Sequence, residues 1–137
     1  MAFAMNAPSP AIASLYVAIG GGAGAALRYH LGRLMTHWAG PNMVFPWGTF
    51  AANIIGSLAM GVLVGVLARH GDPGGHWRLF LGVGLLGGFT TFSSFSMELV
   101  LLAERDAYGM AALYSGVSLA AGVAAMFTGL VIMRTTG

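Results

Sequence analysis

The sequence predicts an all-α membrane protein with four transmembrane helices. Hydrophobic residues make up 57% of its 137 residues, whereas Asp, Glu, Lys and Arg make up only 7%. An average soluble domain has about 25% charged residues, so six basic and four acidic residues are too few to cover a surface that faces water. A spanning helix needs about 20 apolar residues, and four of them with their connections use almost the whole chain. We therefore expect one integral membrane domain over residues 1–137.

Charges and helix breakers divide the chain into four apolar segments, each long enough to cross a bilayer. The connections contain the turn formers and charges that are typical of a membrane surface. Because these connections are short, we expect consecutive helices to be antiparallel. The four predicted spans are residues 11–32, 46–68, 77–103 and 107–133.

The charge balance and the lack of cysteine exclude several classes of function. All six basic residues are Arg and are scattered singly, so a nucleic-acid partner is not expected. Without Cys the chain forms neither a disulfide bond nor a thiolate metal site. The first ten residues lack the basic start of a signal peptide, so we expect the apolar segment after them to be retained as a helix.

Arginine is shared equally between the two ends of the predicted helices, so the positive-inside rule gives no orientation. Two explanations stay open. Counting arginines loses meaning in so small a protein, or the chain inserts in both orientations and pairs as an antiparallel dimer. Three arginines lie on the side of the N-terminus (Arg69, Arg78 and Arg134) and three on the opposite side (Arg28, Arg33 and Arg105).

Twenty-two glycines are spread along the chain, several of them in pairs four residues apart. Small residues at this spacing let helix backbones approach closely, which matters in lipid because no hydrophobic force drives helices together there. The pairs Gly20 and Gly24, Gly61 and Gly65, and Gly84 and Gly88 are therefore expected to serve helix packing.

The third segment contains a run that is poorly suited to an α-helix. Residues 87–96 combine two glycines, two threonines and three serines within a span. We predict that the third helix is interrupted at mid-membrane, where irregular backbone survives only if it lines a cavity or coordinates an ion. A cation held by backbone carbonyls is one interpretation. The other is that the hydroxyls bond back to their own helix.

Two phenylalanines in this run, Phe92 and Phe95, share one helical face beside the serine hydroxyls. Such a pair usually means packing. The alternative is that the positive edges of the rings face a polar path and stabilise a dehydrated anion.

Polar residues recur every four positions on two other segments. Thr49, Asn53 and Ser57 form a stripe on the second, and Tyr114 and Ser118, followed by Gly122, form one on the fourth. A carboxamide at membrane depth is costly unless it is bonded, so Asn53 either links helices or donates its N–H groups to a substrate. Stripes that face one another suggest a path.

Two charges remain in or near the spans, Arg28 and Glu98. Arg28 pairs across helices or extends to the interface, and Glu98 either gates a pore entrance or reaches the interface. The four histidines are too dispersed for a metal site, and no catalytic arrangement is present, so we do not expect an enzyme.

Three motifs carry a resemblance that covers essentially the whole chain. They are residues 21–29 (GGAGAALRY), Trp47, Gly48 and Thr49 with Asn53 and Gly56, and residues 87–96 (GGFTTFSSFS) with Glu98. With these motifs the sequence resembles the CrcB/Fluc fluoride ion channels. The resemblance implies a multi-pass protein of the plasma (inner) membrane that passively exports cytoplasmic fluoride and relieves its toxicity. It further implies an antiparallel, dual-topology homodimer with a structural sodium ion (Na⁺) at the centre of its interface.

The resemblance also assigns roles to individual residues. The backbone carbonyls of Gly87 and Thr90 from both subunits would hold the sodium, ring edges of Phe92 and Phe95 would face fluoride, and Arg28 would be structural. The full expected fluoride path is Asn53, Phe92, Ser93, Ser94, Phe95, Ser96, Glu98, Tyr114 and Ser118. Two residues depart from the family pattern: Ser94 replaces the usual Thr, and Gly122 stands where some members have a hydroxyl residue.

Two rival functions stay open at this stage. A small dual-topology multidrug transporter that exchanges drugs for protons wants an intramembrane carboxylate early in the chain, whereas the only acid within the predicted spans is Glu98, in the third. A membrane assembly subunit without transport activity would use its polar stripes only to join helices.

Overall fold

The computed structural model describes residues 7–73 and 75–136. Within these residues four helical stretches are long enough and apolar enough to cross a membrane, which confirms the predicted all-α fold with four candidate spans. The third stretch consists of several consecutive helical segments. In chain order the elements are α1 (Pro10–Ala39), α2 (Trp47–His70), η2 (Arg78–Leu86), α3 (Gly87–Phe89), α4 (Phe92–Glu104) and α5 (Tyr108–Thr135).

Local sequence accounts for where the first two long helices begin or end. Ser9 caps α1 by accepting a hydrogen bond from the Ile12 N–H, and Pro10 occupies the first turn, where no amide donor is needed. Gly40 and Gly71 end α1 and α2 with φ values of 85° and 73°. Glycine is favoured at both positions because side chains clash in this left-handed region.

The start of the third stretch differs from a plain α-helix, because η2 is a π-helix. The N–H of Gly87 donates to the carbonyl of Gly82, five residues back. This wider helix was not predicted from the sequence. Its two buried glycines allow close packing on two sides, because Gly84 lies against α1 and Gly82 faces Leu63 of α2.

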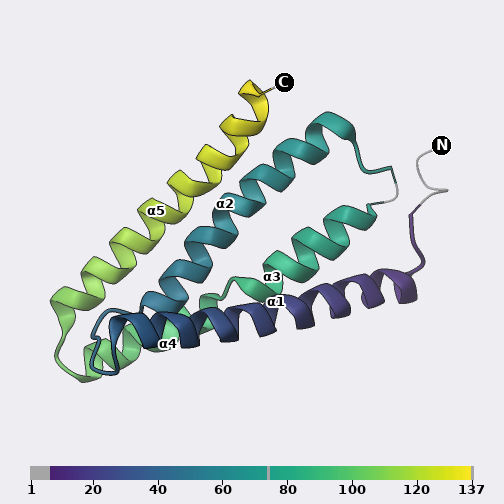
Figure 1. Cartoon of the computed structure of the whole chain (residues 1–137). Helices are drawn as coiled ribbons and strands as arrows, with labels where there is room; N and C mark the ends of the chain where they lie inside the picture. Colours follow the sequence, from purple (N-terminus) through teal and green to yellow (C-terminus); the bar gives the residue numbers. More distant parts are fainter. Residues whose placement is uncertain (1–6, 74, 137) are drawn as a thin grey trace.

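The helices are arranged as two packed pairs joined at one end (Figure 1). Helix α5 runs along α2, and α1 crosses η2 and α3. Beyond the break that follows α3, α4 extends to the end of the molecule where α5 begins. The end of α5, the start of α1, the end of α2 and the start of η2 lie towards the opposite end, so consecutive spans are antiparallel.

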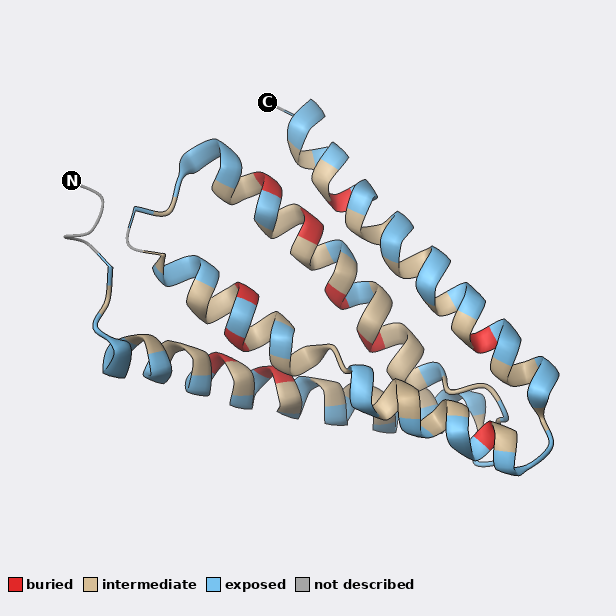
Figure 2. Cartoon of the chain, turned by 180° about the vertical axis from the view of Figure 1, so that it is seen from behind, coloured by how far each residue is buried: buried red, intermediate tan, exposed pale blue. Residues whose placement is uncertain are grey.

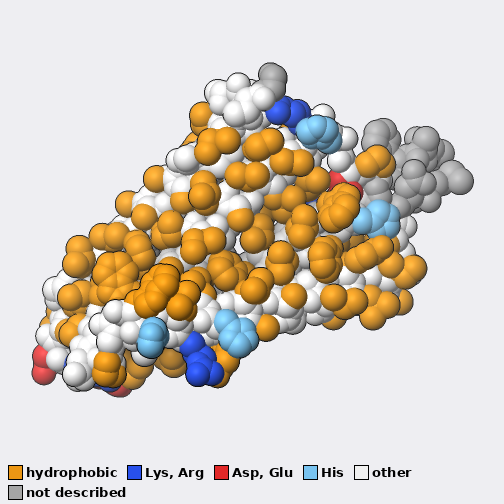
Figure 3. Space-filling view, in the orientation of Figure 1, with side chains coloured by type: hydrophobic (Ala, Val, Ile, Leu, Met, Phe, Trp, Pro, Cys, Tyr) orange, Lys and Arg blue, Asp and Glu red, His pale blue; other side chains and the backbone are white. Residues whose placement is uncertain are grey.

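Few residues are buried within the single chain (Figure 2). Among the described residues the buried hydrophobic ones are Ala52, Leu102 and Tyr114, and no polar or charged residue is buried. Hydrophobic side chains cover most of the face shown in Figure 3, and charged side chains and histidines lie along its margins. A surface of this kind suits lipid or another protein rather than water.

Glycine takes the place of a hydrophobic core at the helix crossings. A Cβ atom added at Gly24 would collide with the carbonyl oxygen of Leu85, and one at Gly61 would collide with that of Met126. At Gly84 an added Cβ would lie only 3.1 Å from the Cα of Gly20. The predicted packing function of the glycine pairs is therefore confirmed, since these helices touch backbone to backbone.

Enlarging one such glycine tests this packing. Overpacking usually costs about 1–3 kcal/mol. We expect Gly24→Leu to exceed this range, because the backbone of Leu85 and Phe89 occupies the space that the side chain would need. Gly22→Leu on the same helix is the control, since nothing lies within 4 Å of a Cβ at Gly22. Thermal melting followed by size-exclusion chromatography in detergent measures the difference. Equal melting of the two variants would contradict the packing.

Candidate functional site

The third span is broken at two threonines. Thr90 (φ −82°, ψ 155°) and Thr91 (φ −150°, ψ 121°) are extended, between the end of α3 at Phe89 and the start of α4 at Phe92. Thr91 begins the new helix, because its hydroxyl accepts a hydrogen bond from the Ser94 N–H at 3.2 Å. Other hydroxyls of the run do bond back to their own helix, as Thr90 does to the Leu86 carbonyl at 2.9 Å. The hydroxyl interpretation therefore holds for part of this run, and the predicted interruption of the helix is present beside it.

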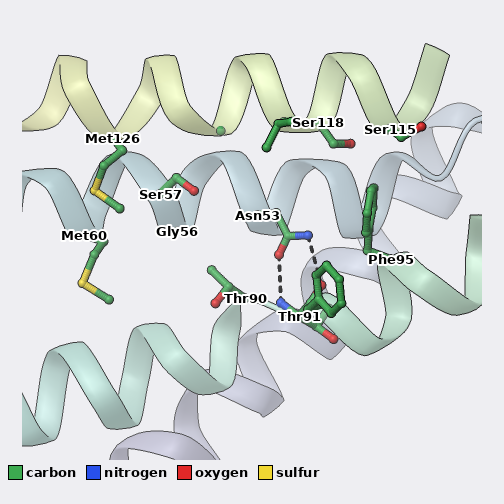
Figure 4. Close-up of a pocket in the computed structure, with 13 residues that line it drawn as sticks. Asn53, Gly56, Ser57, Met60, Thr90, Thr91, Phe95, Ser115, Ser118 and Met126 are labelled. Atoms are coloured by element: carbon green, nitrogen blue, oxygen red, sulfur yellow. Dashed lines mark hydrogen bonds between the residues drawn. The ribbon is translucent and has the colours of Figure 1, made fainter. Parts of the chain in front are cut away.

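Asn53 of α2 holds the broken backbone through both ends of its carboxamide (Figure 4). Its Nδ2 donates to the carbonyl oxygen of Thr91 at 3.1 Å, and its Oδ1 accepts from the Thr91 N–H at 2.8 Å. Of the two interpretations for Asn53, the helix link is therefore present. One N–H of the carboxamide is not used in this pair and is available to another acceptor.

These contacts release two backbone carbonyls from their helical partners. In a continuous α-helix the Thr91 N–H would donate to the Gly87 carbonyl and the Ser94 N–H to the Thr90 carbonyl. Instead they donate to Asn53 Oδ1 and to the Thr91 hydroxyl. The carbonyl oxygens of Gly87 and Thr90, the two residues expected to hold sodium, thus lose their helical donors, as do those of Gly88 and Phe89 at the same helix end.

Arg28 of α1 contacts the same region. Its Nε donates to the Gly88 carbonyl at 3.2 Å. Arg28 therefore pairs across helices, which is one of its two expected behaviours. The helix that ends at Phe89 presents its negative, carbonyl-bearing end here, and this end stabilises the positive charge of Arg28.

A cavity of about 560 Å³ lies between α2, the break, α4 and α5. Of the expected path and sodium residues, Asn53, Thr90, Phe92, Phe95 and Ser118 line it. Figure 4 shows Asn53, Thr91 and Phe95 towards one end of this space and Met60 and Met126 towards the other. The remaining lining residues are Gly56, Ser57, Ser115, Leu119 and Gly122.

Glu98 of α4 is held inside the bundle by two hydroxyl donors. Its Oε1 accepts from Thr49 Oγ1 at 2.6 Å and its Oε2 from the Tyr114 hydroxyl at 2.7 Å. Tyr114 is fully buried, and its ring lies 5.0 Å from that of Phe95, which lines the cavity. Glu98 itself lines a second cavity of about 550 Å³ together with Arg28 and other residues. A series of contacts through Tyr114 therefore runs from Glu98, in the second cavity, to Phe95, in the first.

The serines of the expected path fall into two groups. Ser118 Oγ is buried and makes no hydrogen bond to any part of the chain that the structure describes. The others do not line the cavity: Ser93 and Ser94 lie within 3.3 Å of the Thr91 hydroxyl, and Ser96 donates to the Phe92 carbonyl at 3.0 Å. The rings of Phe92 and Phe95 lie 6.0 Å apart with their planes at 41°.

Comparison with known proteins gives a consistent result. The family model described as CrcB-like protein, Camphor Resistance (CrcB), matches residues 15–130. Proteins named fluoride-specific ion channel FluC are similar along nearly their full length. The protein from Novosphingobium aromaticivorans is 63% identical over 122 residues, which is 89% of this chain and 96% of the relative. For Phenylobacterium zucineum the identity is 54% over 123 residues, 89% of this chain and 95% of the relative. For Erythrobacter litoralis it is 50% over 134 residues, 95% and 98%.

The chain belongs to the CrcB family. It is a multi-pass membrane protein, with four apolar helices of spanning length. The relatives of this CrcB protein are named as ion channels, in agreement with the expectation that it is not an enzyme. The matched region contains the break, both cavities and all the expected path and sodium residues.

Two features of the CrcB site were not predicted from the sequence. Thr49 was expected on a polar stripe, but its hydrogen bond to Glu98, 49 residues away, was not. No role was predicted for Thr91, whose backbone and hydroxyl make most of the contacts at the break. The signal for Thr91 was present, because a hydroxyl three residues before a helical N–H is a common N-cap.

The hydrogen bonds to Glu98 can be tested by removing one donor. Tyr114→Phe keeps the buried ring but deletes the hydroxyl, and we expect it to lower stability by about 1.5–3 kcal/mol, as for hydrogen bonds to charged groups. Tyr108→Phe is the control, because Tyr108 is exposed at the start of α5. Thermal melting in detergent gives the comparison. If both variants melt like the wild type, Glu98 does not depend on Tyr114.

Proposed function

We propose that this CrcB-family protein is a fluoride-selective passive channel that exports cytoplasmic fluoride. The observation that carries this proposal is the similarity to proteins named fluoride-specific ion channel FluC, at up to 63% identity over nearly the whole of both chains. The cavity beside the break supports it, because it combines an apolar lining with a few hydrogen-bond donors.

Fluoride is small and strongly hydrated, so a pore must replace its water with aligned donors while staying too narrow for larger anions. Two such donors are the Asn53 N–H that Thr91 does not use and the Ser118 hydroxyl, which has no partner among the described residues. Phe92 and Phe95 offer ring edges, which are positive and hold an anion without the full charge that would trap it. We assign the remaining expected path residues, Ser93, Ser94, Ser96, Glu98 and Tyr114, to the approaches of this cavity.

The functional unit in this proposal is an antiparallel, dual-topology homodimer. Phe92 lines the cavity and is 80% exposed, so the cavity reaches the surface of the single chain. In a lone chain the donors of the path would therefore adjoin lipid, which is unfavourable. A second copy covers this face, and the equal division of arginine between the two ends suits a chain that inserts both ways.

A structural sodium ion at the dimer centre is the second part of the proposal. Gly87 and Thr90 have carbonyl oxygens that have lost their helical donors, and Gly87 is exposed on the single chain. Hard cations prefer oxygen ligands of this kind, so the residues fit the ion. Gly87 and Thr90 of both copies would hold it, and its charge would compensate carbonyl oxygens that the break leaves without N–H donors.

Ion release from liposomes tests the function. We expect the purified protein to release fluoride rapidly and chloride negligibly under a valinomycin-set potential, as read with ion-selective electrodes. Phe92→Ile and Phe95→Ile should each slow fluoride release at least roughly tenfold, about 1.4 kcal/mol of barrier, because the positive ring edges are lost.

Phe127→Ile is the matched control for these variants, since Phe127 is exposed on α5 and does not line the cavity. It should conduct like the wild type. Wild-type rates in both Phe92 and Phe95 variants would remove the rings from the mechanism. A folded wild-type protein that releases no fluoride would overturn the channel proposal and favour a transporter or an assembly subunit.

A further inference from the structure

We propose that the Ser57 hydroxyl is a fluoride ligand in this chain, opposite a gap in the row of polar side chains on α5. The inference rests on the proposed channel function and adds a specificity-determining residue to it. Ser57 lies on α2 one turn after Asn53 and lines the same cavity.

The gap lies on the cavity face of α5. Tyr114, Ser118 and Gly122 follow one another at intervals of four residues, which places them on one side of the helix. Tyr114 and Ser118 carry hydroxyls, whereas Gly122 has no side chain. Ser118 and Gly122 line the cavity. A row of donors built from α5 alone therefore stops at Ser118.

Ser57 stands directly opposite this gap. A Cβ atom added at Gly122 would have Ser57 Oγ, at 3.7 Å, as its nearest neighbour, followed by Ile54 Cδ1 at 3.9 Å. Both distances are ordinary van der Waals contacts, so the space at Gly122 accepts a small side chain. The hydroxyl that α5 lacks at this level of the cavity is thus supplied from α2.

The Ser57 hydroxyl is also free to bind. Most hydroxyls on the helices donate to a carbonyl one turn back, as Ser115 does to Ala111 at 2.6 Å and Ser14 does to Pro10 at 2.8 Å. Within the described part of the chain, no hydrogen bond of this or any other kind involves Ser57 Oγ, and the same holds for the buried Ser118 Oγ. Ser57 Oγ, unlike Ser118 Oγ, is accessible, and because Ser57 lines the cavity its hydroxyl can donate to a ligand there.

These positions extend the donor path from the break along the cavity. Asn53 and Ser57 lie on the same face of α2, four residues apart, with Ser118 across from them on α5. Beyond Ser57 the lining becomes Met60 and Met126 (Figure 4). Fluoride accepts strong hydrogen bonds. An ion that moves along the cavity past Asn53, Ser118 and Ser57 would therefore keep a hydrogen-bond donor where water is excluded.

The test compares variants in the liposome assay for fluoride release. Ser57→Ala should release fluoride roughly tenfold more slowly than the wild type, as expected when one hydrogen bond to a charged ligand is lost. Ser14→Ala is the matched control and should be unchanged, because Ser14 is exposed on α1 and bonds to its own helix. Ser57→Thr retains a hydroxyl and should keep most of the rate.

The decisive variant moves the hydroxyl across the cavity. Adding Gly122→Ser to Ser57→Ala should restore fluoride release, because the new side chain enters the space that faces residue 57. Wild-type release by a folded Ser57→Ala protein, or no rescue by Gly122→Ser, would overturn the inference while leaving the channel function intact. If the wild type itself releases no fluoride, the proposed function fails first and the inference falls with it.

Discussion

The pair of hydrogen bonds between Asn53 and the Thr91 backbone supports the break on which the rest of the site depends. An amide N–H and a carbonyl that leave a helix inside a membrane have no water to bond with, and each costs several kcal/mol if it is left alone. Asn53 satisfies both with one side chain. Because α2 carries this carboxamide, the break is tied to a helix that packs along α5, and the cavity between them has a fixed wall.

The break in turn sets what the site offers an ion. It starts α4 afresh at Phe92, so Phe92 and Phe95 lie beside the cavity. It diverts the donors of the Gly87 and Thr90 carbonyls, and Arg28 takes up the carbonyl of Gly88 between them. Close glycine contacts hold these segments together where side-chain burial does not, since the described chain buries only three hydrophobic residues. In the proposed channel, groups that bind fluoride and carbonyls that bind sodium would thus come from the same irregular segment.

Much of this arrangement was predictable, because a lipid bilayer strongly restricts which amino acids a spanning helix can contain. The four helices follow from apolar length, the backbone contacts from glycine spacing, and a break from the threonine and glycine content of residues 87–96. The sequence did not predict which polar side chains on different helices form hydrogen bonds with one another. Asn53 had two plausible uses, and only the fold brings it to Thr91, 38 residues away. The contacts of Glu98 with Thr49 and Tyr114, and the π-helix at Arg78–Leu86, likewise depend on how separate segments pack.

The most direct test of the central claim measures the break and the ion flow in the same preparation. In Asn53→Ala the Thr91 amide loses its acceptor, so hydrogen exchange at Thr91 should accelerate relative to the wild type, and fluoride release from liposomes should be largely lost while the protein stays folded. Faster exchange at Thr91 together with wild-type fluoride release would contradict the account, because the conducting site would then not depend on the carboxamide that holds the break.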